Sequence, residues 1–297
     1  MKIIRTLEEM GEAAPCSLAL GAFDGLHRGH MAVIHAACAP GEEGASLEPA
    51  VLTFARSPSG NSAVLTGRDK ERLLEAAGVE RLYSLDFAAV KDWEAEAFVQ
   101  QVLFAKCGAR RLCQQAGAEL YVAPPVREGE QKVSSTRIRA AVEAGDIPLA
   151  NRLLGRPFGF SLEVIHGNHI GTGLGTPTIN QAIPEGFVLP KFGVYASWCR
   201  VGGEYFYGVT NVGIKPTVGS DRVLAETWMP DFQGDLYGKR VRVFLLEFLR
   251  PERKFHSLDE LKAAIRENGE QAKAVTSRIS PPYFPQTTLQ EAKSVIK

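Results

Sequence analysis

Two histidines three positions apart are the first residues in this sequence whose types and spacing suggest chemistry. They lie in the string Gly-Ala-Phe-Asp-Gly-Leu-His-Arg-Gly-His at residues 21–30. The string follows an apolar run and opens an amphipathic segment, where open parallel sheets bind ligands. Glycines let the backbone approach a phosphate, and the amides of a helix N-terminus add positive potential. The string is therefore a candidate phosphate site or, alternatively, a glycine-rich turn with surface histidines; its candidate residues are Gly21, Phe23, Asp24, His27 and His30.

A second candidate site begins with a run of hydroxyl side chains followed by a cation. Ser134, Ser135, Thr136 and Arg137 stand where a helix is expected to begin. A hydroxyl-rich helix start can bind an anion, and the arginine is suited to pair with phosphate oxygens. The alternative is that the serines and threonine only cap the helix.

A third string combines a flexible loop with two oxygen-bearing side chains. Gly171, Gly173 and Gly175 alternate along the chain, so this loop is able to wrap phosphates with its amides. Thr178 and Asn180 follow at the spacing that places both side chains on one face of a strand. Their hydroxyl and amide oxygens suit a Mg²⁺ ion bound to ATP. The alternative is a hairpin with a glycine turn.

The elements that position the first two strings have the pattern of parallel βαβ units. Apolar runs predict strands, and helical periodicity between them predicts helices, with a helical hinge after residue 134. The expected strands are 17–20, 50–54, 81–86 and 120–123, and the expected helices are 31–38, 69–77, 94–104, 109–116, 138–143 and 147–154.

From residue 158 the pattern changes to period-2 strands separated by glycine and proline turns, which predicts an antiparallel barrel. A final amphipathic helix, 258–268, is expected behind Ser257 and should pack on the barrel. The proline-rich segment 280–285 should separate it from a short terminal helix. The expected strands are 160–166, 193–201, 205–212 and 240–248.

Composition narrows the classes of partner. The 297 residues carry 34 Lys plus Arg and 34 Asp plus Glu, so no global positive field recruits nucleic acid or an anionic membrane. The five cysteines are odd in number and form no CxxC pair, which indicates reduced thiols. No secretory leader and no apolar run of membrane-spanning length is evident, so we expect a cytoplasmic enzyme that acts on small molecules. The oligomeric state is not predicted.

The strings at 21–30 and 134–139 together resemble the HxGH nucleotidyltransferase superfamily, and more narrowly the N-terminal domain of bacterial bifunctional riboflavin kinase/FAD synthetases. The resemblance implies that His27 and His30 contact the phosphates of ATP. Two features depart from the family pattern. A strand and a Gly-x-Asp-Phe-x-Phe-Gly-like loop are missing between Phe104 and Gly117, and the second expected strand is followed by Phe-Ala-Arg-Ser-Pro at 54–58, without the histidine common there.

The C-terminal half resembles the riboflavin kinase domain of the same family, from Leu-Leu-Gly-Arg-Pro at 153–157 to the helix at 258. The resemblance implies a Greek-key barrel in which the Gly171 loop closes over ATP, Thr178 and Asn180 hold Mg²⁺, and Glu226 accepts the proton of the ribityl 5′-hydroxyl. Thr172, Thr176, Ile179 and Trp228 replace residues common in the family. The other strings that carry the likeness are Gly-Val-Tyr at 193–195, Asn-Val-Gly-Ile-Lys-Pro-Thr at 211–217, Glu-Thr at 226–227 and Asp-Phe-Gln-Gly-Asp-Leu-Tyr-Gly-Lys at 231–239.

The resulting expectation is an α/β nucleotidyltransferase-like domain at 1–152, an all-β riboflavin kinase domain at 153–280 and a tail at 281–297. The leading hypothesis is riboflavin phosphorylation to FMN with adenylylation of FMN to FAD. Its substrates are riboflavin, FMN and ATP, and its metal is Mg²⁺. Three alternatives stay open: a kinase with a degenerate N-terminal domain, an N-terminal domain active on another substrate, and a non-catalytic flavin or nucleotide sensor.

Overall fold

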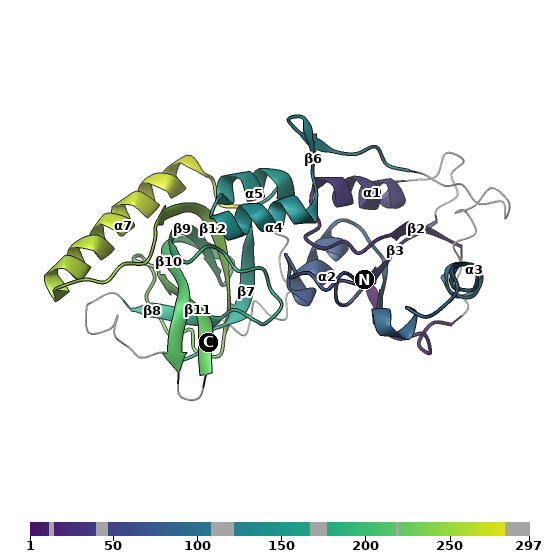
Figure 1. The fold of residues 1–297 in the computed structure, drawn as a ribbon, viewed down its shortest axis with the longest axis horizontal. Helices are drawn as coiled ribbons and strands as arrows, with labels where there is room; N and C mark the ends of the chain where they lie inside the picture. The colour runs from purple at the N-terminus through teal and green to yellow at the C-terminus, as the bar shows by residue number, and fades with distance from the viewer. Residues whose placement is uncertain (12–14, 40–46, 108–121, 167–176, 218–219, 283–297) are drawn as a thin grey trace. The chain divides into compact units, whose positions relative to one another are not determined.

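A computed structural model describes residues 1–11, 15–39, 47–107, 122–166, 177–217 and 220–282. The chain divides into two compact units, Met1–Ser135 and Thr136–Lys297. Figure 1 shows the elements of both units.

The first unit is built on a four-stranded parallel sheet in the order β1-β4-β3-β2. Its strands are β1 (Lys2–Ile4), β2 (Cys16–Leu20), β3 (Glu48–Phe54) and β4 (Arg81–Leu85). Three of these strands match the sequence prediction, and β1 was missed. The predicted strand 120–123 is not confirmed, because 122–123 are not in a strand and 120–121 lie outside the described residues.

Both faces of this sheet are buried, as expected of a parallel sheet with crossover helices. Alternate residues of β3 point to the two faces: Val51 packs in the cluster that includes Ile34 of α1 and Leu74 of α2, and Leu52 packs in the cluster that includes Val102. The helices are α1 (Arg28–Cys38), α2 (Gly67–Ala76), a 3-10 turn η1 (Phe87–Ala89), α3 (Ala95–Phe98) and a π-helical segment η2 (Val99–Phe104). The predicted helix 94–104 is therefore two segments of different winding. The predicted helix 109–116 lies outside the described residues.

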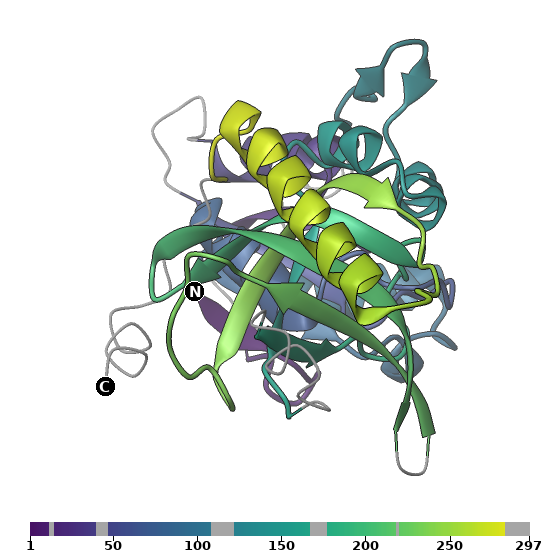
Figure 2. The ribbon, with the colours of Figure 1, turned by 90° about the vertical axis from the view of Figure 1, so that its left-hand side faces the viewer.

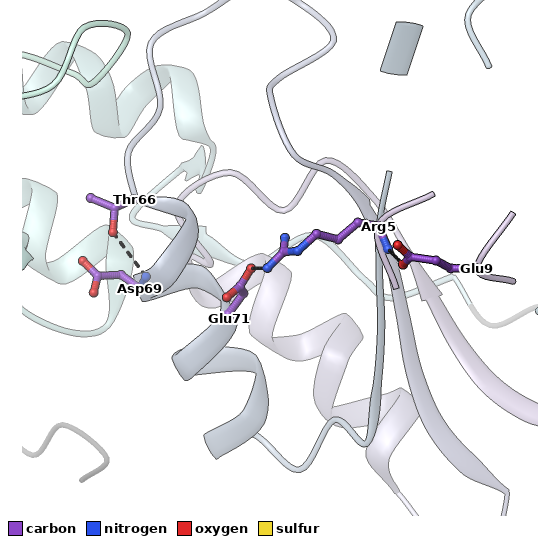
Figure 3. Close-up of polar contacts among 5 residues, drawn as sticks. All are labelled: Arg5, Glu9, Thr66, Asp69 and Glu71. Atoms are coloured by element: carbon purple, nitrogen blue, oxygen red, sulfur yellow. Dashed lines mark hydrogen bonds and ion pairs between the residues drawn. The ribbon is translucent and has the colours of Figure 1, made fainter. Parts of the chain in front are cut away.

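Polar contacts fix α2 against the start of the chain (Figure 3). The Thr66 hydroxyl accepts a hydrogen bond from the Asp69 amide at 3.2 Å and so caps the helix. The Arg5 guanidinium binds the Glu71 carboxylate at 2.7 Å, and the Glu9 carboxylate accepts from the Arg5 amide at 2.8 Å. The Arg5–Glu71 ion pair joins α2 to the segment that follows β1.

The second unit contains a six-stranded antiparallel sheet in the order β7-β12-β9-β10-β11-β8. The two edge strands approach each other, since the Ile165 amide donates to the Asn180 carbonyl at 2.8 Å. The Gln181 side-chain amide also donates to the Leu162 and Val241 carbonyls, at 2.7 and 2.8 Å. The sheet therefore nearly closes into the predicted barrel; its strands are β7 (Gly159–Glu163), β8 (Thr178–Ala182), β9 (Gly193–Val201), β10 (Glu204–Thr217), β11 (Ser220–Trp228) and β12 (Arg240–Arg250).

One long helix, α7 (Leu258–Arg278), lies across the outer face of this barrel (Figure 2). Its Ala272 and Val275 pack with Ala196 of β9 and Leu246 of β12. Ser257 caps the helix as predicted, accepting from the Glu260 amide at 3.1 Å. The helix continues ten residues beyond the predicted end at Asn268. Residues 280–282 are not helical, and the predicted terminal helix lies outside the described residues.

Two short helices precede the barrel, α4 (Ser135–Ala144) and α5 (Ile147–Leu154), and all of their residues except Ser135 belong to its unit. The Lys191 amide donates to the Val142 carbonyl at 3.2 Å, and the Asn151 side-chain amide donates to the Leu245 carbonyl at 3.2 Å. The compact units therefore divide between residues 135 and 136. The boundary of the catalytic domains at 152/153 stays a prediction.

Candidate active sites

The loop between β2 and α1, residues 21–27, has a strained backbone. Phe23 and Leu26 have φ of 45° and 42°, a region that side chains with a Cβ rarely adopt, and Gly25 between them has φ of 83°. Both non-glycine side chains are buried, at 2% and 0% exposure. Burial of Phe23 and Leu26 anchors the strained turn, and strain of this kind concentrates at ligand sites.

The two histidines are brought together at the start of α1. Their rings stack with centroids 3.5 Å apart and planes 16° apart. His27 is the N-cap residue, and its Nδ1 accepts from the His30 amide at 3.2 Å. Because Nδ1 accepts, a neutral His27 carries its proton on Nε2. Gly29 leaves room for this ring, since a Cβ there would lie 3.2 Å from His27 Cε1.

The other residues of the predicted string take supporting positions. Asp24 Oδ1 accepts from the Val64 amide at 2.9 Å, and the Asp24 carbonyl accepts from the Ser135 hydroxyl at 2.7 Å. These bonds tie residues 21–27 to segments far away in the sequence. A side chain at Gly21 would crowd the Phe23 ring, with a Cβ 3.1 Å from it.

Ser134 and Ser135 fall in the first unit, whereas Thr136 and Arg137 fall in the second. Ser134 directly precedes α4 and is half-buried, and Thr136 is exposed on its first turn. The proposed role of Arg137 stays a prediction from the sequence.

Lys70 of α2 was not identified from the sequence, yet it holds the same loop. Its Nζ donates to the Ala22 carbonyl at 2.8 Å, to Thr53 Oγ1 at 2.8 Å and to the Phe54 carbonyl at 3.3 Å. Burial lowers the pKa of Lys70 to about 8, although the Asp24 carboxylate partly opposes this shift. The ammonium thus joins the loop to the carboxyl end of β3.

In the barrel, strand register places the predicted kinase residues side by side. Glu226 of β11 lies directly opposite Asn180 of β8, and Trp228 lies opposite Thr178. On its other side Glu226 lies opposite Asn211 of β10. Directly opposed side chains in antiparallel strands share a face. We call the row Asn180, Glu226 and Asn211 the polar row.

The environment of the polar row differs from that of the barrel interior. Asn180 is 6% exposed and Glu226 is half-buried. The adjacent residue Thr227 points to the opposite face, where its hydroxyl lies 3.0 Å from that of Thr210 in a buried contact. The row therefore combines carboxylate and amide groups near the hydroxyl of Thr178. The predicted phosphate loop with Gly171, Gly173 and Gly175 lies outside the described residues.

Both halves of the chain match models of known protein families. A family model described as riboflavin kinase matches residues 154–276, and one described as FAD synthetase matches residues 9–113. The bifunctional riboflavin kinase/FMN adenylyltransferase of Listeria monocytogenes is 31% identical over 88% of this chain and 93% of its own length. The chain belongs to this bifunctional family. Its Escherichia coli K12 member is 33% identical over 89% of this chain and 95% of its own length.

A solved structure supports the fold across both units. The crystal structure described as a macrolide-efflux protein from Streptococcus pneumoniae has a TM-score of 0.81 and 28% sequence identity. It covers 92% of this chain and 99% of its own. Among the residues that the structure describes, no helix is long and apolar enough to cross a membrane. The predicted family and fold class are confirmed.

Proposed function

We propose that this family member phosphorylates riboflavin to FMN in its second unit and adenylylates FMN to FAD in its first. ATP serves as donor in both reactions. The observation that carries the kinase half is the strand register, which sets Glu226 opposite Asn180, with Thr178 two positions before Asn180 on the same strand. The presence of both family domains in one chain supports the pair of reactions.

In the kinase reaction the ribityl 5′-hydroxyl oxygen attacks the γ-phosphorus of ATP, and the bond from that phosphorus to the β,γ-bridging oxygen breaks. ADP leaves, and the hydroxyl proton passes to the Glu226 carboxylate. A positioned carboxylate suits this step because phosphoryl transfer depends mainly on alignment and charge stabilisation. Glu226 can also orient the hydroxyl before transfer.

The donor set of the barrel site fits Mg²⁺. Thr178 and Asn180 supply hydroxyl and amide oxygens from one face of β8, and oxygen is the ligand that this ion prefers. Bound there with ATP, Mg²⁺ would neutralise negative charge on the triphosphate. Thr178 and Asn180 would hold it, and the glycine loop at 171–175 would enclose the phosphates.

In the adenylylation reaction a phosphate oxygen of FMN attacks the α-phosphorus of ATP, and pyrophosphate leaves. The stacked histidines and the first amides of α1 can stabilise the charge that develops on that phosphate. His27 contributes through Nε2, because its Nδ1 is occupied by the helix cap.

A second candidate function is riboflavin phosphorylation alone. Two sequence features favour it: Ala-Arg-Ser-Pro at 55–58 lacks the histidine common in the family, and the Gly-x-Asp-Phe-x-Phe-Gly-like loop is missing between residues 104 and 117. Both changes lie in the N-terminal half of the chain, where adenylylation of FMN is expected. The kinase barrel is unaffected by them.

One product assay separates these functions. The full chain is incubated with riboflavin, ATP and Mg²⁺, and the flavins are separated by chromatography. FMN followed by FAD supports both activities, FMN alone supports the kinase alone, and neither product contradicts the proposal. His30→Ala should abolish FAD while FMN formation continues, because the two sites are separate. Tight flavin binding without either product would support the sensor hypothesis instead.

A further inference from the structure

Asn211 of β10 has a hydrogen-bonding arrangement that the proposed mechanism does not use. Its Nδ2 donates to Glu252 Oε1 at 3.0 Å. Its Oδ1 is buried and accepts no hydrogen bond from the part of the chain that the structure describes. Buried polar atoms normally have a partner, so this oxygen calls for a donor from outside the described residues.

Glu252 lies in the segment between β12 and α7, and its position depends on Gly213. A Cβ at residue 213 would lie 2.3 Å from Glu252 Oε1 and 2.7 Å from Oε2. No side chain larger than hydrogen fits there unless the carboxylate moves. Gly213 therefore admits the carboxylate close to β10, two residues beyond Asn211.

The carboxylate fixes which end of the Asn211 amide faces it. A carboxylate only accepts, so the NH₂ group turns toward Glu252 and the oxygen turns away. Register places the Asn211 side chain on the same face as Glu226, directly across from it. Opposed side chains of neighbouring strands have Cβ atoms about 4.5–5.5 Å apart, so one flexible polyol can reach both.

We propose that Asn211 binds the substrate of the kinase reaction, with its Oδ1 accepting a hydrogen bond from a secondary hydroxyl of the ribityl chain. Glu252 is a positioning residue that holds the amide in this orientation. The inference rests on the proposed kinase function, in which Glu226 takes the proton of the terminal hydroxyl. An acceptor beside that base suits a substrate whose neighbouring carbons also carry hydroxyl donors.

Steady-state kinetics of FMN formation by the full chain test this inference. Asn211→Ala should raise the KM for riboflavin about tenfold and leave the KM for ATP within twofold, because one hydrogen bond to riboflavin is lost. Glu252→Ala and Gly213→Ala should act in the same direction. Glu252→Gln should restore wild-type kinetics, since its amide oxygen can still accept from Asn211.

Matched controls exclude a purely structural effect. Lys254→Ala changes an exposed side chain of the same segment and should leave both KM values unchanged. Circular dichroism and thermal unfolding should show that Asn211→Ala is folded at the assay temperature. An Asn211→Ala variant that is folded and has wild-type KM for riboflavin would overturn the inference.

A binding measurement identifies the part of the flavin that Asn211 contacts. Riboflavin carries the ribityl chain, whereas lumiflavin has the same ring system without it. Flavin fluorescence should show weakened binding of riboflavin to Asn211→Ala and unchanged binding of lumiflavin. Equal weakening of both ligands would place the contact on the ring and contradict the inference. If the wild-type chain forms no FMN, the proposed kinase function itself fails.

Discussion

Asn180 shows how strand register positions a single side chain of the proposed metal site. It is almost fully buried, lies opposite Glu226 and shares its strand face with Thr178. A buried amide oxygen next to a carboxylate favours a cation, since the cation offsets the repulsion between the two oxygens. Thr178 and Asn180 could be singled out from the sequence because they are two positions apart in an expected strand.

Replacing Asn180 should weaken the metal requirement of the kinase in a measurable way. With Asn180→Ala, the Mg²⁺ concentration for half-maximal FMN formation at fixed ATP should rise at least tenfold, because one oxygen ligand is lost. Removal of Mg²⁺ with a chelator should abolish FMN formation in the wild type. A Mg²⁺ titration curve identical to that of the wild type would show that Asn180 is not a ligand.

The helix cap that His27 forms can be separated from its proposed phosphate contact by substitution. His27→Ala removes both, whereas Asn at this position can still accept from the His30 amide. We expect both variants to lose FAD formation. The free energy of unfolding should fall by about 1 kcal/mol only in His27→Ala, which denaturant unfolding measures. Full FAD formation by His27→Asn would rule out the phosphate contact.

Other site residues could not have been predicted from their local sequence. Lys70 matters because its ammonium reaches the Ala22 carbonyl, 48 residues away in the chain. Asn211 matters because Glu252, 41 residues away, orients its amide. Neither contact leaves a local spacing signal. Glu226 could be singled out only through the resemblance to a known family.

At the scale of helices and strands, most elements follow from periodicity, and the misses have physical causes. β1 has three residues, too few to show a period of two. The predicted end of α7 at Asn268 comes directly before Gly269, and glycine often ends a helix. In the structure Gly269 is inside the helix, where a Cβ would lie 3.1 Å from the Trp228 ring. Gly269 is therefore needed for close packing of α7 against Trp228 and does not end the helix.

Lys70 joins α2 to the loop at 21–27, so we expect the adenylylation reaction to depend on the charge of Lys70. Its lowered pKa of about 8 means that the ammonium loses its proton as the pH rises through that value. Asp24 is the charged group acting on it, and its hydrogen-bond partners are uncharged oxygens. Neutral Lys70 has one donor fewer than its three acceptors require.

We therefore expect FAD formation from FMN to decline between about pH 7 and 9, which is about one unit on either side of that pKa. FMN formation from riboflavin is the internal control. Lys70→Met should reduce FAD formation at least tenfold at every pH. Lys70→Arg keeps a permanent charge, so any activity that it retains should not show the decline. Normal FAD formation by Lys70→Met would contradict a role for Lys70 in holding the loop.

At the scale of the whole molecule, two units with separate cores each carry one candidate site. The change from parallel units to period-2 strands predicted this division in the sequence. The position of the structural boundary was harder to predict, because α4 and α5 have the same helical periodicity as the helices before them. Only their packing on the barrel assigns them to the second unit.

Buried thiols and a phenol predict how stability depends on pH. Burial raises the pKa of Cys16 to about 11 and those of Cys107, Cys199 and Tyr83 to about 12. Between about pH 9 and 12 the folded chain keeps protons that the unfolded chain releases, so stability falls as the pH rises. The lowered pKa of Lys70 makes stability rise with pH between about pH 8 and 10.5, but this is one group against four.

The free energy of unfolding should therefore be highest below pH 9 and fall steadily above it, by up to about 1.4 kcal/mol per pH unit for each such thiol. Urea unfolding at a series of pH values measures this slope. Cys199→Ala should lower the free energy of unfolding at every pH, because it leaves a cavity. The same variant should make the slope of that free energy against pH shallower, because one buried thiol no longer contributes. A slope unchanged in this variant would show that the Cys199 thiol does not contribute.

The role of Glu226 as the base of the kinase site is the central proposal for the barrel. Transfer of label from [γ-³²P]ATP to riboflavin tests this most directly, with wild-type chain, Glu226→Gln and His30→Ala compared under identical conditions. Wild type and His30→Ala should both form labelled FMN, and Glu226→Gln should form it at least about 10²-fold more slowly while binding riboflavin normally. Labelled FMN formed at the wild-type rate by Glu226→Gln would contradict the assignment.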